Sequence, residues 1–69
     1  MEAWMERWNR AMDEIEQNLT GQIDYERVGR IACCSASHFQ RMFPYLAGVP
    51  LGEYVRRRRM SLAAADLQA

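Results

Sequence analysis

The sequence has no lysine and no long run of apolar residues, and the second absence excludes a membrane-spanning protein. No stretch approaches the about 20 apolar residues of a membrane-spanning helix, and the first residues lack the basic start of a secretory signal peptide. A length of 69 residues excludes an enzyme with a separate substrate domain. Because 49% of the residues are hydrophobic, a disordered chain is not expected. We therefore expect one small folded domain without a membrane segment.

Positive charge comes almost entirely from nine arginines, and these are distributed unevenly. The formal net charge is zero, but residues 1–26 hold seven acidic residues and two arginines, whereas residues 27–69 hold seven arginines and two acidic residues. Such a division allows a basic surface on a neutral molecule. Arginine also suits bidentate contacts with phosphate or guanine, because its guanidinium group is a planar fork of donors. The second part of the chain is therefore the candidate for contact with nucleic acid.

Apolar residues recur at spacings of three and four in four segments, which is typical of helices with one buried face. The residues between these segments support the division, because Asp24 and Ser35 are suited to N-caps and Gly48 to a C-terminal cap. In the third segment, Pro44 is expected to kink the helix or end it early. We predict an all-α fold, a small three- to four-helix bundle, with helices over residues 3–19, 25–32, 36–47 and 51–67.

The two middle helices form a helix-turn-helix pattern, since only about three residues join them. The face of the second of these helices that lies opposite its apolar stripe carries Ser37, Gln40 and Arg41. In a major groove, glutamine can pair with adenine, arginine with guanine, and a serine hydroxyl with a base edge or a phosphate. An ordinary solvent-exposed face has the same spacing, so periodicity alone leaves both interpretations open.

Motifs in the third and fourth segments resemble a known family of transcription regulators. Residues 38–43 read H-F-Q-R-M-F and are followed by Gly48 and by G-E-Y-V-R at residues 52–56. These motifs resemble the first helix-turn-helix of AraC/XylS-family regulators, and the similarity extends over nearly the whole chain. The resemblance implies that residues 1–69 are a single DNA-binding subdomain of a bacterial regulator and that residues 51–67 are a long linker helix. It also implies that a second helix-turn-helix subdomain and an effector-binding domain are missing, so that the chain is a fragment.

The resemblance further implies roles for individual residues. Ser37, Gln40 and Arg41 occupy the positions at which the family's recognition helix meets bases, and the implied partner is double-stranded DNA in the cytoplasm. No catalytic residue, cofactor or metal is expected, because the sequence shows no nucleophile with a base and no phosphate-binding glycine loop. The residues expected to contact the DNA backbone are Ser35, His38, Arg30, Arg57 and Arg58.

Some of these charged and polar residues have plain structural alternatives. His38 is also compatible with a partly packed surface histidine. Within the run of arginines at residues 56–59, Arg56 or Arg59 would pair with acidic residues of the first helix instead of contacting DNA. Glu14 and Glu16 are expected to lie on a solvated face.

The adjacent cysteines and the tryptophans are expected to have structural roles. Cys33 and Cys34 are predicted to be buried thiols of the turn, because adjacent cysteines do not easily bridge and His38 alone leaves too few ligands for zinc. Trp4 and Trp8 are expected to pack in the core, and an exposed docking patch is the alternative.

A function of a different class is suggested by the last predicted helix. Without a further subdomain to cover it, this helix leaves an apolar stripe that is compatible with a protein–protein interaction module or a homodimer. The residues of that stripe are Val55, Met60, Ala63, Ala64 and Leu67.

Overall fold

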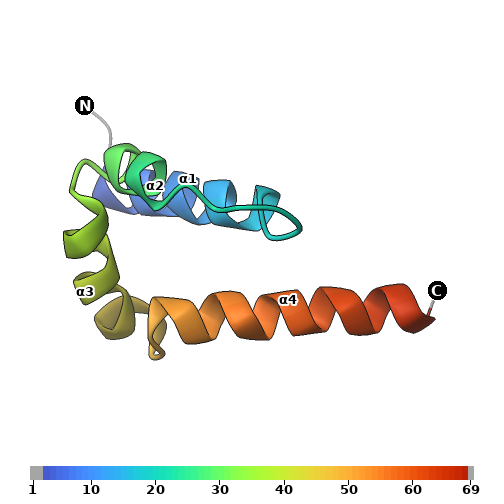
Figure 1. Cartoon of the computed structure of the whole chain (residues 1–69). Coiled ribbons are helices and arrows are strands. Elements are labelled where there is room, and N and C mark those ends of the chain that lie inside the picture. The colour runs from blue at the N-terminus through green and yellow to red at the C-terminus, as the bar shows by residue number, and fades with distance from the viewer. Residues whose placement is uncertain (1–2, 69) are drawn as a thin grey trace.

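The computed structural model describes residues 3–68, with side chains for residues 3–65, and this part of the chain consists of helices and no strands. The predicted all-α class is therefore confirmed. Figure 1 shows the first two helices side by side, the third crossing one end of the molecule, and the fourth running back below them and projecting beyond. None of the helices in the described residues is both long enough and apolar enough to cross a lipid bilayer. The helices are α1 (Trp4–Gln17), α2 (Tyr25–Ile31), α3 (Ala36–Ala47) and α4 (Leu51–Gln68).

The helix bounds differ from the predicted ranges by at most two residues. The largest difference is at the end of α1, which ends at Gln17 instead of residue 19. Here the backbone N–H of Asn18 donates to the carbonyl of Ile15 (3.1 Å), and its side-chain amide donates to the carbonyl of Glu14 (2.8 Å). These bonds satisfy carbonyls that a longer helix would have used, so the chain leaves the helix two residues early.

Local capping bonds define the ends of the helix-turn-helix, and all three predicted caps are confirmed. The side chain of Asp24 accepts a hydrogen bond from the backbone N–H of Arg27 (3.2 Å) at the start of α2. The hydroxyl of Ser35 accepts one from the backbone N–H of His38 (3.1 Å) at the start of α3. Gly48 ends α3 with a φ of 82°, a left-handed conformation that glycine adopts without steric cost.

The helices enclose one hydrophobic core with an aromatic cluster at its centre. The ring of Trp8 lies 5.2 Å from that of Phe39 and 5.5 Å from that of Phe43, and Phe43 lies 5.4 Å from Tyr54 of α4. The core thus joins α1 and α4 to the inner face of α3. Its buried residues are Ala11, Ile15, Leu19, Val28, Phe39, Phe43, Leu51 and Val55.

Two predictions about burial were wrong. Val55 was expected in an uncovered stripe but is buried in the core, because α4 packs against α3 through its first turns. Trp4 was expected in the core but is 43% exposed, since it stacks on Trp8 at a centroid distance of 6.2 Å from the outer side. The core therefore ends at Trp8.

Gly29 allows α2 and the turn after it to approach closely. A Cβ atom at this position would lie 2.8 Å from the backbone carbon of Ser35 and 2.9 Å from the backbone nitrogen of Ala36. The backbone N–H of Cys34 also donates to the carbonyl of Gly29 (2.8 Å). Only a residue without a side chain fits here, so Gly29 sets how closely α3 follows α2.

Candidate nucleic-acid interface

The rotation of α3 about its own axis is determined by its buried aromatic residues. Phe39 and Phe43 are four residues apart, lie on one side of the helix, and are both buried against Trp8. Because a helix turns by about 100° per residue, the side opposite these rings must face away from the core. The packing of two rings thus decides which polar side chains of α3 are presented outward.

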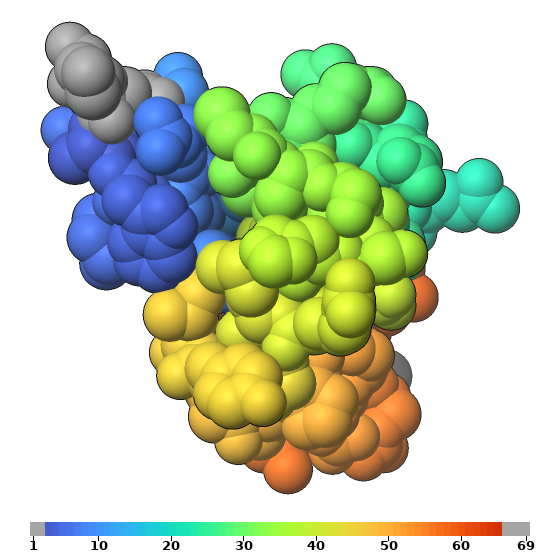
Figure 2. Space-filling model, turned by 90° about the vertical axis from the view of Figure 1, so that its left-hand side faces the viewer, coloured from blue at the N-terminus to red at the C-terminus, as the bar shows by residue number. Residues whose placement is uncertain are grey.

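The three residues predicted to contact bases are all exposed, with Ser37 and Arg41 opposite the rings and Gln40 on the flank of the helix. Ser37, Gln40 and Arg41 are exposed, whereas Phe39 and Phe43, which lie between and after them in the sequence, are buried. Figure 2 looks onto this end of the molecule, where α3 occupies the centre of the face, with α1 on one side and α2 above. The structure therefore brings the three residues together on the surface of the second helix of a helix-turn-helix.

Pro44 does not end the helix that carries these residues, so the prediction of an early end was wrong. The helix continues through Pro44 to Ala47. The proline lacks an N–H and thereby removes one helical hydrogen bond. Its carbonyl nevertheless accepts a bond from the N–H of Gly48 (2.9 Å), and the preceding Phe43 is anchored in the core. Pro44 itself is exposed, so its ring is placed where it disturbs no packing.

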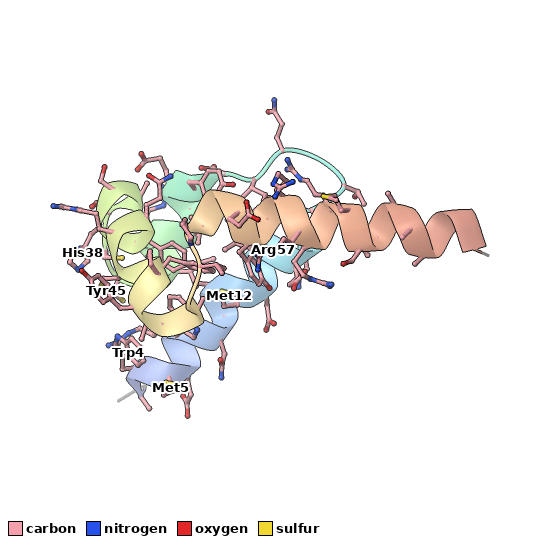
Figure 3. The ribbon with its side chains drawn as sticks, turned by 90° about the horizontal axis from the view of Figure 1, so that it is seen from below. Trp4, Met5, Met12, His38, Tyr45 and Arg57 are labelled. Atoms are coloured by element: carbon pink, nitrogen blue, oxygen red, sulfur yellow. The ribbon has the colours of Figure 1, made fainter. Side chains whose placement is uncertain are left out.

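The residues predicted to contact the DNA backbone fall into two groups. Arg30, Ser35 and His38 are exposed and lie at the end of α2, in the turn, and at the start of α3. The two arginines of α4 are held by carboxylates: Arg57 pairs with Glu53 (2.9 Å) and Arg58 with Glu16 of α1 (3.0 Å). Figure 3 shows His38 at the outer edge formed by α3, whereas Arg57 lies along α4. The first group thus lies on α2, the turn and the start of α3, and the second group lies on α4.

Glu14 and Glu16 join helices to one another, and the prediction of a solvated face was wrong for both. Glu14 pairs with Arg27 of α2 (3.2 Å) and accepts a bond from the amide of Asn18 (2.9 Å). Glu16 accepts a hydrogen bond from the hydroxyl of Tyr54 (2.7 Å) and pairs with Arg58 of α4. The acidic residues of α1 therefore neutralise part of the positive charge of the later helices.

Competing effects act on the Glu16 carboxylate. Burial raises its pKa, but the hydrogen bonds from Tyr54 and Arg58 and the positive charge of Arg58 lower the pKa by more, and the net pKa lies below its ordinary value. The pKa of the Tyr54 hydroxyl is raised by burial and by the negative charge of Glu16. Both groups therefore keep the protonation states that the hydrogen bond requires. The sequence gives one partial signal of this site, since residues 54 and 58 are four apart and share a helix face.

Arg59 connects α4 to the loop between α1 and α2. Its guanidinium group donates to the carbonyl of Leu19 (2.9 Å) and to that of Gly21 (3.0 Å). The alternative in which Arg56 or Arg59 pairs with acidic residues of the first helix is wrong, because Arg56 pairs with Glu53 in its own helix (2.8 Å). Within the arginine run, Arg56 and Arg57 thus share Glu53 of their own helix, whereas Arg58 and Arg59 reach α1 and the loop after it.

The two cysteines of the turn have different environments. Cys34 is half-buried, and its pKa is raised by burial and by the neighbouring thiol of Cys33. Cys33 is exposed, so the prediction of two buried thiols was wrong for it. Its φ of 63° is in the left-handed region, which residues other than glycine rarely adopt. Within the described residues, no three metal-binding side chains gather in one place.

Known proteins match this chain over most of its length. It is 43% identical over 54 residues to the HTH-type transcriptional activator AarP of Providencia stuartii, a match that covers 78% of this chain and 40% of AarP. It is 39% identical over 57 residues to the multiple antibiotic resistance protein MarA of Escherichia coli, which covers 83% of this chain and 45% of MarA. The chain is a homologue of AraC-family helix-turn-helix regulators.

The matches of this AraC-family homologue cover only part of its relatives. The TetD protein of transposon Tn10 is 37% identical over 54 residues, which cover 78% of this chain and 39% of TetD. The chain spans less than half the length of these three relatives. No protein-family profile and no solved structure matches it.

Proposed function

We propose that this chain is a helix-turn-helix unit that binds double-stranded DNA by placing α3 in the major groove, as part of a bacterial transcription regulator. The observation that carries the proposal is the exposed row of Ser37, Gln40 and Arg41 on a helix whose rotation is held by a buried aromatic cluster. A helix fits the width of a major groove, and its outward side chains then meet the edges of base pairs. The regulator relatives support the same function.

The side chains of α3 suit different kinds of contact with DNA. Gln40 has the paired donor and acceptor that adenine requires, and Arg41 has the fork of donors that guanine requires. The hydroxyl of Ser37 accepts or donates to a base edge or a phosphate. We assign these three residues to sequence recognition.

Residues at the start of α3 suit contacts with phosphates. Ser35, His38 and Arg30 are exposed around the N-terminus of this helix, where the unpaired backbone N–H groups also favour an anion. A phosphate contact by Arg57 or Arg58 would have to compete with Glu53 or Glu16. We therefore assign the main backbone contacts to the group around α3.

The proposal also covers the longer regulator of which this chain would be a part. We expect it to act on transcription in the bacterial cytoplasm and to have no enzymatic activity, as its relatives are transcription regulators. A second DNA-binding subdomain and an effector-binding domain would complete it.

The proposal is tested by selecting preferred duplexes from a random pool and measuring their binding by fluorescence anisotropy at low salt. The double variant Gln40→Ala/Arg41→Ala is expected to bind the selected duplex at least about 30-fold more weakly, since each bidentate base contact contributes about 1–3 kcal/mol. Its circular dichroism spectrum is expected to match that of the unmodified chain, because both side chains are exposed.

A matched control removes one glutamine and one arginine outside α3. Gln17 of α1 and Arg56 of α4 are both exposed, so Gln17→Ala/Arg56→Ala changes the net charge by the same amount. We expect this variant to keep its preference for the selected duplex. The proposal fails if no duplex is enriched, or if the α3 double variant binds as tightly as the control.

A second candidate function is self-association through α4. Beside this helix lies a groove of about 420 Å³ lined by residues that include Tyr25, Val55 and Met60, and the side chain of Met60 is 58% exposed. Ala63 and Ala64 are also exposed, whereas the side chain of Leu67, which the sequence placed in the same stripe, lies outside the described residues. Light scattering over a range of concentrations tests this candidate. A dimer that Met60→Glu dissociates would support it, and a monomer at all concentrations would exclude it.

A further inference from the structure

Tyr45 is the most exposed of the large hydrophobic residues that the structure leaves on its surface, with 92% of its side chain accessible. It lies within the last turn of α3 and not in a loop. An exposed aromatic ring gains nothing from folding, because it buries almost no apolar surface. Its position on the candidate recognition helix suggests a role in binding.

Tyr45 lies on the same exposed side of α3 as Ser37 and Arg41. Ser37, Arg41 and Tyr45 are spaced by four, so each lies about 40° around the helix from the one before it. The row extends for about 12 Å along the helix axis, since each residue rises about 1.5 Å. This length is close to the width of a major groove, which is about 12 Å. When the N-terminal part of the row meets bases, its last member lies near the wall of the groove.

At this end of α3, the phenol of Tyr45 is the side chain suited to bind a phosphate. Residues 44–47 are Pro, Tyr, Leu and Ala, so the Tyr45 hydroxyl is the only side-chain hydrogen-bond donor of the last turn. This turn also contains no basic residue. Tyrosine hydroxyls are among the groups that donate to phosphate oxygens in protein–DNA complexes. Figure 3 shows Tyr45 and His38 together at the outer edge of the molecule that α3 forms.

We infer that the Tyr45 hydroxyl donates a hydrogen bond to a backbone phosphate and so anchors the C-terminal end of α3 at the wall of the major groove. The inference rests on the proposed DNA-binding function. Together with Ser35 and His38 at the other end, it gives the helix two anchors, which define how far Gln40 and Arg41 enter the groove. Because a phosphate contact carries no sequence information, Tyr45 contributes to affinity for every duplex.

The test compares Tyr45→Phe with the unmodified chain on the selected duplex and on a scrambled one. Loss of one hydrogen bond to a charged phosphate is expected to weaken binding to both duplexes by a similar factor, about 10-fold or more. The salt dependence of binding is expected to stay the same, because the phenol is uncharged and releases no counterion. Tyr25→Phe, which removes a hydroxyl from α2, is the matched control and is expected to bind normally.

Neutral methylphosphonates placed one at a time along the selected duplex locate the contacted phosphate. At the contacted position, the methylphosphonate is expected to weaken binding of the unmodified chain by a larger factor than binding of Tyr45→Phe, because the variant has already lost the hydrogen bond to that phosphate. The inference is overturned if Tyr45→Phe binds both duplexes like the unmodified chain, or if its loss is confined to the selected duplex, which would indicate a base contact. If the unmodified chain binds no duplex at all, the proposed function fails first.

Discussion

A methyl group at Gly29 tests whether the close approach of α2 to the turn after it holds the helix-turn-helix together. The Cβ atom of Gly29→Ala would lie 2.8–2.9 Å from three backbone atoms, which belong to Cys34, Ser35 and Ala36. All three belong to the turn and the first residue of α3, so none of them can move aside as a flexible side-chain end would. The new methyl group must therefore push α3 away from α2.

Two effects of opposite sign determine the size of this change. Replacing glycine by alanine inside a helix normally stabilises it by about 0.5–1 kcal/mol, because alanine loses less backbone entropy on folding. An extra methyl group in a tightly packed site costs about 1–3 kcal/mol, and occasionally more. Backbone contacts below 3.0 Å place Gly29 at the upper end of that range. We expect a net destabilisation of about 2 kcal/mol, which lowers the melting temperature by about 8–16 °C in a domain of this size.

Gly52→Ala provides the matched control for this experiment. Gly52 also lies in a helix, α4, but a Cβ atom there would meet nothing within 4 Å. The same substitution is therefore expected to raise the melting temperature, as only the entropic gain remains. Both variants are measured by thermal and urea unfolding with circular dichroism. If Gly29→Ala is as stable as Gly52→Ala, the close approach does not constrain the helix-turn-helix and our reasoning is refuted.

Two further predictions concern the contacts that join α1 to the other helices. The pKa of Glu16 is lowered from its ordinary value of 4.5, so its bonds to Tyr54 and Arg58 stabilise the fold above that pH and lose this effect as the pH falls through the lowered pKa. In urea unfolding between about pH 3 and 7, the free energy of unfolding of Glu16→Gln should therefore fall less steeply toward acid pH than that of the unmodified chain. Equal slopes would contradict this linkage. Phe43→Ala is expected to cost about 3–5 kcal/mol, most of the stability of so small a domain, whereas Leu46→Ala, on an exposed residue of the same helix, should cost far less. Similar melting curves for these two variants would show that the aromatic cluster is not the centre of the core.

Much of the fold follows from interactions between residues that are close in sequence. Asp24 and Ser35 each cap a helix through a bond to a backbone N–H three residues later, so the sequence displays both partners together. Gly48 likewise ends α3 through its own backbone conformation. Helical periodicity also placed Phe39 and Phe43 on the buried side of α3 and Gln40 on its exposed side. The prediction of the outward row of α3 therefore required only the period of a helix.

Other predictions depended on where one helix lies relative to another. Neither the role of Glu16 nor the anchoring by Arg59 can be read from local spacing, because their partners lie about 40 residues away in the chain. The exposure of Cys33, in a turn where its backbone is left-handed, was also not predicted. Similarly, Pro44 was expected on local grounds to kink its helix or end it early, but α3 continues through it to Ala47, with Phe43 buried in the core.

The sequence by itself determined the helices, their caps and the identity of the outward side chains of α3, since each of these depends on bonds and periodicities within a few residues. Only the tertiary structure decided how the charges are used. The division between an acidic beginning and an arginine-rich remainder suggested two separate surfaces, but Glu14 and Glu16 reach Arg27 and Arg58 across helix boundaries. Opposite charges far apart in the chain attract once packing brings their helices together, so part of the positive charge stabilises the fold. Arg41 remains on the outer face of α3, where it is exposed.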